Sequence, residues 1–131
     1  MAIMLFTASH VISGDLVIIC NKSVVESKLS KQELINIYLG KKTTWSDKKK
    51  IIFITQNNAV ISEQFLNEYI NMIAAQYSSY WLEKVFTGQA SPPKSFASDR
   101  EMIQFITKTE GAIGYVSSSE GLSNVKLVEI E

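Results

Sequence analysis

The chain has 131 residues, enough for one domain with a hydrophobic core, and 46% of them are hydrophobic. Lysine plus arginine and aspartate plus glutamate number 13 each, so overall charge gives no reason to expect a nucleic-acid partner. The neutral balance also provides no long-range attraction for an anion, so any anion site has to be local. Cys20 and His10 are the only residues of their types, which excludes an intramolecular disulfide and leaves too few ligands for a zinc site.

The first 14 residues form a short apolar run from Ala2 to Ala8, followed by small residues up to Gly14 and the first charge at Asp15. This pattern resembles the hydrophobic part of a secretory signal peptide, although the basic start is missing. A bilayer span needs about 20 apolar residues, so no stable membrane span is expected. We therefore expect residues 1–14 to be a signal-peptide remnant and residues 15–131 to be a single domain that works in the periplasm or is otherwise exported. A genuine first strand or helix is the alternative for residues 1–14.

The first half of the domain predicts two strands separated by a helix. Residues 16–20 and 51–55 are continuous apolar runs rich in β-branched side chains, typical of strands buried on both faces. Ser30 and Glu33 have the spacing of a capping box, which predicts a helix over residues 30–39. Gly40 follows this helix and is expected to end it.

The second half predicts three helical segments and the last strands. Ser62 is expected to cap a long helix that runs to about residue 76, followed by a second helical stretch over residues 77–86. Residues 87–96 contain both prolines and are expected to form a loop. Ser98, with Glu101 three residues later, opens a helix to about residue 108, and residues 113–116 and 125–130 are the last predicted strands. This alternation predicts an α/β fold, a three-layer sandwich with a small mixed, largely parallel sheet.

Two short motifs near opposite ends of the chain are the most specific feature. The first is Ile-Tyr-Leu-Gly-Lys at residues 37–41, followed by Thr44-Trp45, and the second is Thr-Glu-Gly-Ala-Ile-Gly-Tyr-Val at residues 109–116. Between them lie Tyr-Trp at 80–81, Phe-Thr-Gly at 86–88 and Pro-Pro at 92–93. The order and separation of these motifs resemble the phosphate-type substrate-binding proteins of bacterial ABC transporters, in particular a short, single-domain branch, from about Leu16 to Val128.

This resemblance implies the fold of one lobe of a type 2 periplasmic binding protein and a small oxyanion, such as phosphate, as ligand. In the larger relatives, an arginine and a Ser-Gly-Thr run follow the strand that corresponds to residues 51–55. Here the Ser-Gly-Thr positions carry Ala59, Val60 and Ile61, and residues 55–61 contain no arginine. A helix N-terminus still suits an anion, so the tentative ligand residues are the polar ones around it and after the first strand. These are Gln56, Asn57, Asn58, Ser62 and Asn21. A polar turn followed by an ordinary helix cap remains the alternative.

Other patterns are best explained by packing. The lysines around Trp45 favour a solvated loop with a packed tryptophan over a nucleic-acid patch. Tyr77, Tyr80, Trp81 and Phe86 have helical spacing, which favours core packing over a ligand pocket.

No enzyme is predicted, because one histidine cannot supply a nucleophile, a base and an orienting group, and no cofactor or metal is expected. The sequence leaves two functions open. One is an exported solute-binding protein for phosphate or another small oxyanion in ABC-type uptake. The other is a non-transport interaction module that docks on a cell-envelope protein complex or on itself as a homo-oligomer. The second predicts an exposed apolar or aromatic patch near Trp45, Tyr80 or the two prolines.

Overall fold

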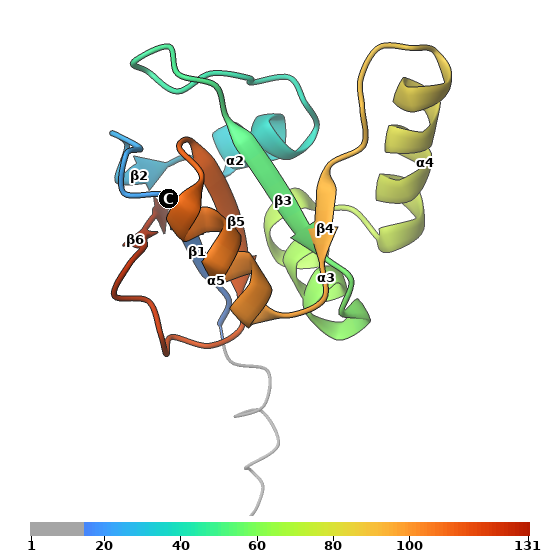
Figure 1. Ribbon diagram of the computed structural model, residues 1–131. Helices are drawn as coiled ribbons and strands as arrows, with labels where there is room; N and C mark the ends of the chain where they lie inside the picture. Colours follow the sequence, from blue (N-terminus) through green and yellow to red (C-terminus); the bar gives the residue numbers. More distant parts are fainter. Residues whose placement is uncertain (1–14) are drawn as a thin grey trace, which may run out of the picture.

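A five-stranded mixed sheet organises the protein, for which a computed structural model describes residues 15–131 (Figure 1). The signal segment expected at residues 1–14 lies outside the described residues. The strand order is β4-β3-β5-β1-β6, with β3 parallel to both β4 and β5, and β1 antiparallel to β5 and β6. The strands are β1 (Val17–Cys20), β3 (Ile52–Gln56), β4 (Lys94–Phe96), β5 (Ala112–Val116) and β6 (Lys126–Leu127). Since β1 alone runs in the direction opposite to the other four strands of this sheet, the predicted α/β fold with a largely parallel sheet is confirmed.

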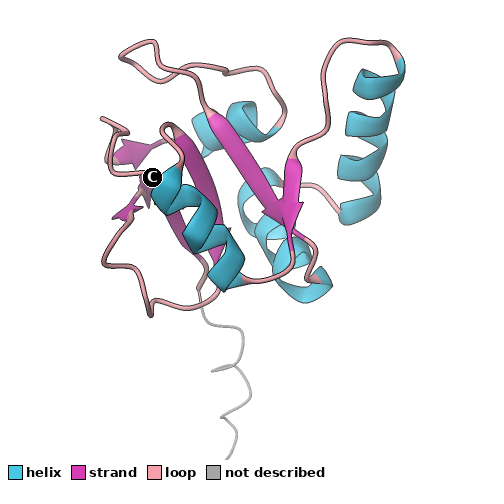
Figure 2. Cartoon of the chain, viewed as in Figure 1, coloured by secondary structure: helices cyan, strands magenta, loops and turns pink. Residues whose placement is uncertain are grey.

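Helices cover both faces of this sheet (Figure 2). Side chains alternate along β5, so Tyr115 and Gly114 face opposite layers. Tyr115 stacks on Phe65 from one helical layer, with ring centroids 3.8 Å apart. A Cβ added to Gly114 would lie 2.9–3.0 Å from side-chain atoms that include Met102 and Ile106 of the other layer. The first layer contains α2 (Lys31–Tyr38), α3 (Ala59–Phe65), the π-helix η1 (Leu66–Ile70) and α4 (Ala74–Phe86), and the second contains α5 (Asp99–Lys108).

The predicted cap of α2 is confirmed. The backbone N–H of Glu33 donates to the Ser30 hydroxyl at 3.0 Å, and the N–H of Ser30 donates to the Glu33 carboxylate at 2.9 Å. Gly40 follows the helix with φ +74°, a conformation that glycine adopts without steric cost. Ser98 likewise caps α5, but the Glu101 carboxylate accepts from the N–H of Ala97, so the capping box is only half formed.

The predicted helix from Ser62 to residue 76 is wrong at both ends. Asn58 caps α3 instead, because its side-chain oxygen accepts from the N–H groups of Val60 and Ile61. The helical run then widens into η1 and stops at Asn71, whose φ of +62° is left-handed. Asparagine tolerates this conformation better than most residues, so the chain turns there and α4 begins afresh at Ala74.

The sequence prediction missed two short strands, β4 and the strand over residues 28–29. β4 lies inside the segment expected to be a loop, where it forms the edge of the sheet directly after the two prolines. Edge strands tolerate a neighbouring proline, because one side of the strand carries no ladder hydrogen bonds. The predicted strand over residues 125–130 divides into β6, which pairs with β1, and β7 (Glu129–Ile130), which pairs with β2 (Lys28–Leu29) in a separate two-stranded sheet.

Aromatic side chains of α4 hold this helix against the C-terminus of α2. The Tyr77 hydroxyl and the Trp81 indole N–H both donate to the carbonyl of Tyr38, at 2.8 and 3.1 Å, and the Tyr80 hydroxyl donates to Leu39 at 2.7 Å. The last carbonyls of a helix have no intrahelical partner, so these donors satisfy groups that would otherwise be unpaired. Core packing is thus confirmed for Tyr77 and Trp81.

The prediction of core packing is wrong for Phe86, which is 84% exposed. Trp45, by contrast, is 2% exposed and donates its indole N–H to the carbonyl of Gly111 at 3.0 Å. The interpretation of Trp45 as a packed loop residue is therefore confirmed.

Candidate functional site

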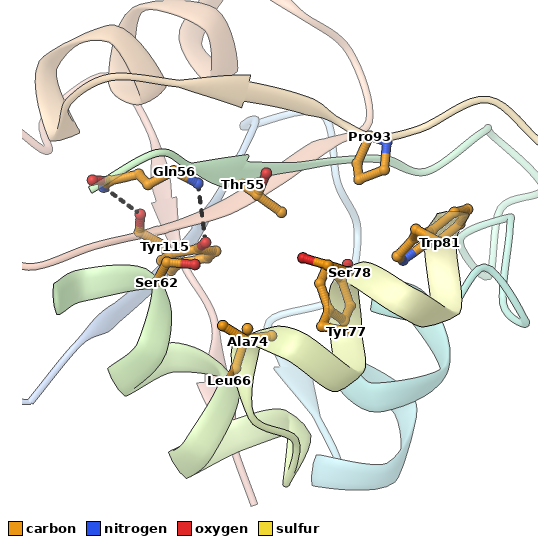
Figure 3. A pocket seen from close by; sticks show the side chains of 10 residues that line it. All are labelled: Thr55, Gln56, Ser62, Leu66, Ala74, Tyr77, Ser78, Trp81, Pro93 and Tyr115. Atoms are coloured by element: carbon orange, nitrogen blue, oxygen red, sulfur yellow. Dashed lines mark hydrogen bonds between the residues drawn. The ribbon is translucent and has the colours of Figure 1, made fainter. Parts of the chain in front are cut away.

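A pocket of about 250 Å³ lies between α4, the start of α3 and the C-terminal ends of β3 and β5. Figure 3 shows Ser62 on α3 and Ser78 on α4 facing each other across its open middle. The lining residues come from β3, α3, η1, α4, the residue before β4, and β5. They are Thr55, Gln56, Ser62, Leu66, Ala74, Tyr77, Ser78, Trp81, Pro93 and Tyr115.

Tyr115 connects the strand ends to the start of α3. Its hydroxyl accepts the backbone N–H of Gln56 at 3.0 Å and forms a hydrogen bond with the Ser62 side chain. Burial raises the pKa of the Tyr115 hydroxyl, an effect that these two hydrogen bonds partly oppose. The hydroxyl therefore stays protonated at neutral pH, and the pocket presents a neutral hydrogen-bonding group at this point.

Gln56 lines the pocket, but its amide points away from the open middle (Figure 3). The amide nitrogen donates to a carboxylate oxygen of Asp99 at 2.5 Å and to the carbonyl of Tyr115 at 3.3 Å. The other Asp99 oxygen accepts from the backbone N–H and the hydroxyl of Ser117, at 3.1 and 2.7 Å. Gln56 therefore ties the end of β3 to the start of α5 and to β5, and Asp99 extends this link to Ser117.

The next two predicted ligand residues lie on the turn after β3 and are not among the pocket residues. Asn57 accepts the Ser95 hydroxyl at 2.5 Å, which links this turn to β4. The side-chain oxygen of Asn58 is occupied by the cap of α3. Of the predicted ligand residues at this end of the sheet, only Gln56 and Ser62 therefore line the pocket.

Asn21 lies at the opposite end of the sheet. It follows β1, which is antiparallel to β5, and its backbone N–H donates to the carbonyl of Ala112 at the start of β5. Its side-chain nitrogen donates to the carbonyls of Ile106 and Thr107, at 2.7 and 3.2 Å. The prediction assumed that all strands end at the same edge of the sheet. β1 runs in the opposite direction and ends at the other edge.

The pocket contains no ionised side chain, because none of its ten lining residues is acidic, basic or histidine. A charged ligand would have to be met by hydrogen bonds from neutral groups. Hydrogen bonds to a charged partner are about twice as strong as those between neutral groups, so hydroxyl donors are chemically suited to oxyanions.

Sequence reasoning missed Ser78 and Tyr115 as pocket residues. Tyr115 belongs to one of the two end motifs, where it appeared only as part of a strand. Ser78 gives no signal, because a serine on a helix is usually solvated. Only the start of a new helix at Ala74 turns Ser78 toward α3.

The one cysteine of the chain lies away from the pocket. Cys20 is fully buried on β1, and this burial raises the pKa of its thiol to about 11. Both observations indicate a packed, unreactive cysteine. Within residues 15–131, no three acidic, histidine or cysteine side chains come together as metal ligands would. No helix in that same stretch has the length and apolar character to cross a membrane.

A family comparison matches residues 5–130 to the model of the PBP superfamily domain. This match agrees with the resemblance inferred from the motifs. A comparison with curated protein sequences found no match.

Solved structures with a similar fold include three bacterial proteins. An ABC-type phosphate transport receptor from Vibrio cholerae has a TM-score of 0.60 at 18% identity, over 88% of this chain and 45% of that one. A putative phosphate ABC transporter substrate-binding protein from Clostridium perfringens, solved with bound phosphate, has a TM-score of 0.63 at 17% identity, over 88% and 44%. A possible phosphate-binding protein from Planctomyces limnophilus has a TM-score of 0.64 at 19% identity, over 88% and 41%. The chain thus spans less than half the length of these three proteins. At such low identity, the similarity shows the fold alone.

Proposed function

We propose that this chain, which belongs to the PBP superfamily domain family, is a solute-binding protein that holds a small oxyanion in the pocket between α3 and α4. The observation that carries the proposal is the pair of facing serines, Ser62 and Ser78, beside the Tyr115 hydroxyl. These groups offer neutral donors at the carboxyl ends of two parallel strands, a common place for ligands in open α/β sheets.

Phosphate is the first oxyanion to test, since the similar structures are described as phosphate receptors and binding proteins. By the same analogy, the protein would be exported and would deliver its ligand to an ABC transporter. The analogy is to a fold, so the ligand has to be tested on the pocket itself.

The N-terminus of α3 contributes less to this site than the sequence suggested. Two of its backbone N–H groups, those of Val60 and Ile61, already donate to Asn58. The side chains of Ser62 and Ser78 therefore replace the backbone cradle as the main donors in this proposal.

The test is a thermal-shift titration of the full chain with phosphate and with sulfate. A ligand that binds only the native state stabilises it by RT ln(1 + [L]/Kd), about 2.7 kcal/mol at 100 times Kd. For a domain of this size, that free energy corresponds to a rise of roughly 10 °C in the unfolding midpoint.

Ser62→Ala combined with Ser78→Ala should abolish the rise. Ser79→Ala is the matched control, because it changes the same residue type one position further along α4, outside the pocket lining. A midpoint that does not move with either anion at millimolar concentration would refute anion binding.

An interaction module of a cell-envelope complex is the second candidate, and exposed apolar side chains on α4 favour it. Leu82 and Phe86 are 63% and 84% exposed and lie four residues apart, hence on one face of the helix. This surface differs from the expected one at Trp45, which is buried. A pull-down from cell envelopes that is lost with Leu82→Ser and Phe86→Ser, alongside an absent anion response, would favour this function.

A further inference from the structure

The size of the pocket exceeds the needs of an inorganic oxyanion. A cavity of about 150 Å³ is enough to accommodate benzene, which has six heavy atoms. A tetrahedral oxyanion such as phosphate has five, whereas the pocket between α3 and α4 measures about 250 Å³. An inorganic anion would therefore leave a large part of the pocket unfilled.

The unfilled part can make only apolar contacts. Tyr77 and Trp81 line it, but the hydroxyl of the first and the indole N–H of the second already donate to the carbonyl of Tyr38. They present ring carbon atoms to the pocket and no free donor. Leu66 and Ala74 add aliphatic surface between them and Ser62 (Figure 3).

The hydroxyl of Thr55 is also occupied. It donates to the carbonyl of Lys94 at 3.3 Å, across the β3–β4 pair. The polar side chains that face the open middle of the pocket are thus Ser62, whose hydroxyl is shared with Tyr115, and Ser78, while Trp81 and Pro93 form its far end (Figure 3). Pockets for organic ligands have this division, with a largely apolar wall and a few polar groups that fix the orientation.

We infer that the ligand of this pocket is a small oxyanion that carries an organic substituent, such as a phosphonate or a phosphate monoester. Its oxygens face Ser62 and Ser78, and its organic group packs against Leu66, Ala74 and Trp81. The inference rests on the proposed function, because it names the class of oxyanion that the same pocket takes. The substituent adds affinity by removing apolar surface from water, a contribution that requires no counter-charge in the pocket.

Isothermal titration calorimetry of the full chain with inorganic phosphate, methylphosphonate and phenylphosphonate tests this inference. The expected result is a Kd that falls from phosphate to phenylphosphonate by about tenfold or more, given the apolar area that a phenyl ring buries. A large negative heat-capacity change for phenylphosphonate alone would mark burial of the ring. Benzyl alcohol, which has the ring without the oxyanion, should bind far more weakly.

Ala74→Leu narrows the apolar end and should weaken the binding of phenylphosphonate more than that of phosphate, so that the difference between their Kd values shrinks. Ala75→Leu is the control, since its neighbouring position on α4 does not line this pocket. The series in the unaltered protein decides the question even if Ala74→Leu fails to fold.

The outcomes separate the two proposals. If phosphate binds as tightly as phenylphosphonate, the inference of an organic substituent is overturned, while the proposal of oxyanion binding stands. No binding of any of the three anions, or binding of benzyl alcohol as tight as that of phenylphosphonate, would overturn both.

Discussion

Gly111 offers the sharpest test of how this fold is held together. Its φ of +79° is left-handed, and a Cβ added there would lie 2.2 Å from the carbonyl oxygen of Lys50. Its own carbonyl accepts from the indole N–H of Trp45 and from the backbone N–H of Ile52, each at 3.0 Å. Gly111→Ala therefore adds an unfavourable backbone conformation and forces apart two segments that these hydrogen bonds join.

The cost can be worked out in two parts. A left-handed conformation costs a non-glycine residue roughly 1–2 kcal/mol. Relieving the clash requires the backbone to move by about 1 Å, which weakens both hydrogen bonds, and a buried donor left unpaired costs about 1–3 kcal/mol. We expect Gly111→Ala to lower the free energy of unfolding by about 2–5 kcal/mol, a large share of the ~5–15 kcal/mol typical of a domain.

Gly121→Ala is the matched control for urea denaturation. Gly121 has nearly the same φ, +73°, but no atom within 4 Å of an added Cβ. It should lose only the conformational part, about 1–2 kcal/mol. Equal losses in the two variants would refute the argument that close approach at residue 111, beyond glycine conformation, holds the loop of Trp45 to the sheet.

Three further changes test the site and its surroundings. Gln56→Glu replaces the donor to Asp99 with a second carboxylate. We expect the free energy of unfolding, measured by urea denaturation, to fall by about 2–4 kcal/mol at pH 7, and by less in acid, where the two carboxylates become protonated. A loss that does not change with pH would contradict this explanation. Asn58→Ala should cost about 1 kcal/mol by removing the cap of α3, and Asn58→Ser should restore most of it, whereas equal losses would argue against a capping role. The raised pKa of Cys20, about 11 against 9.0, means that the folded state holds the thiol proton more tightly. Its contribution is therefore complete below pH 9 and is lost as pH rises toward 11, by up to about 3 kcal/mol. The unaltered protein should lose more stability than Cys20→Ala over that interval, and parallel pH curves would contradict a buried thiol.

Local signals predicted the elements whose ends are chemically marked. The capping box at Ser30 and the glycine at residue 40 fixed α2 almost to the residue. The apolar run before Gln56 fixed β3 in the same way. These features act over a few residues, so the sequence alone contains the information.

The region after β3 was harder to predict because tertiary contacts decide it. Asn58 and Ser62 are both good cap residues, and helical spacing of apolar side chains continues through the break at Asn71. Which residue caps, and where the helix stops, depends on how Phe65 reaches Tyr115 and how α4 meets α2. The pocket lies in this region, so its serine pair could not be read from the pattern.

The contacts explain why the motifs predict the fold and leave the ligand open. A Cβ on Gly40 would lie 2.9 Å from the Trp81 ring, and Trp45 donates to Gly111, so the motif residues touch one another across the chain. They fix the positions of α4 and of the loop before β3. The fold needs this framework whatever ligand the pocket binds. Ser62 and Ser78, which face the open middle of the pocket, belong to none of these motifs. A chain can therefore keep the whole motif pattern, and with it the fold, while changes at these two positions alter what the pocket binds.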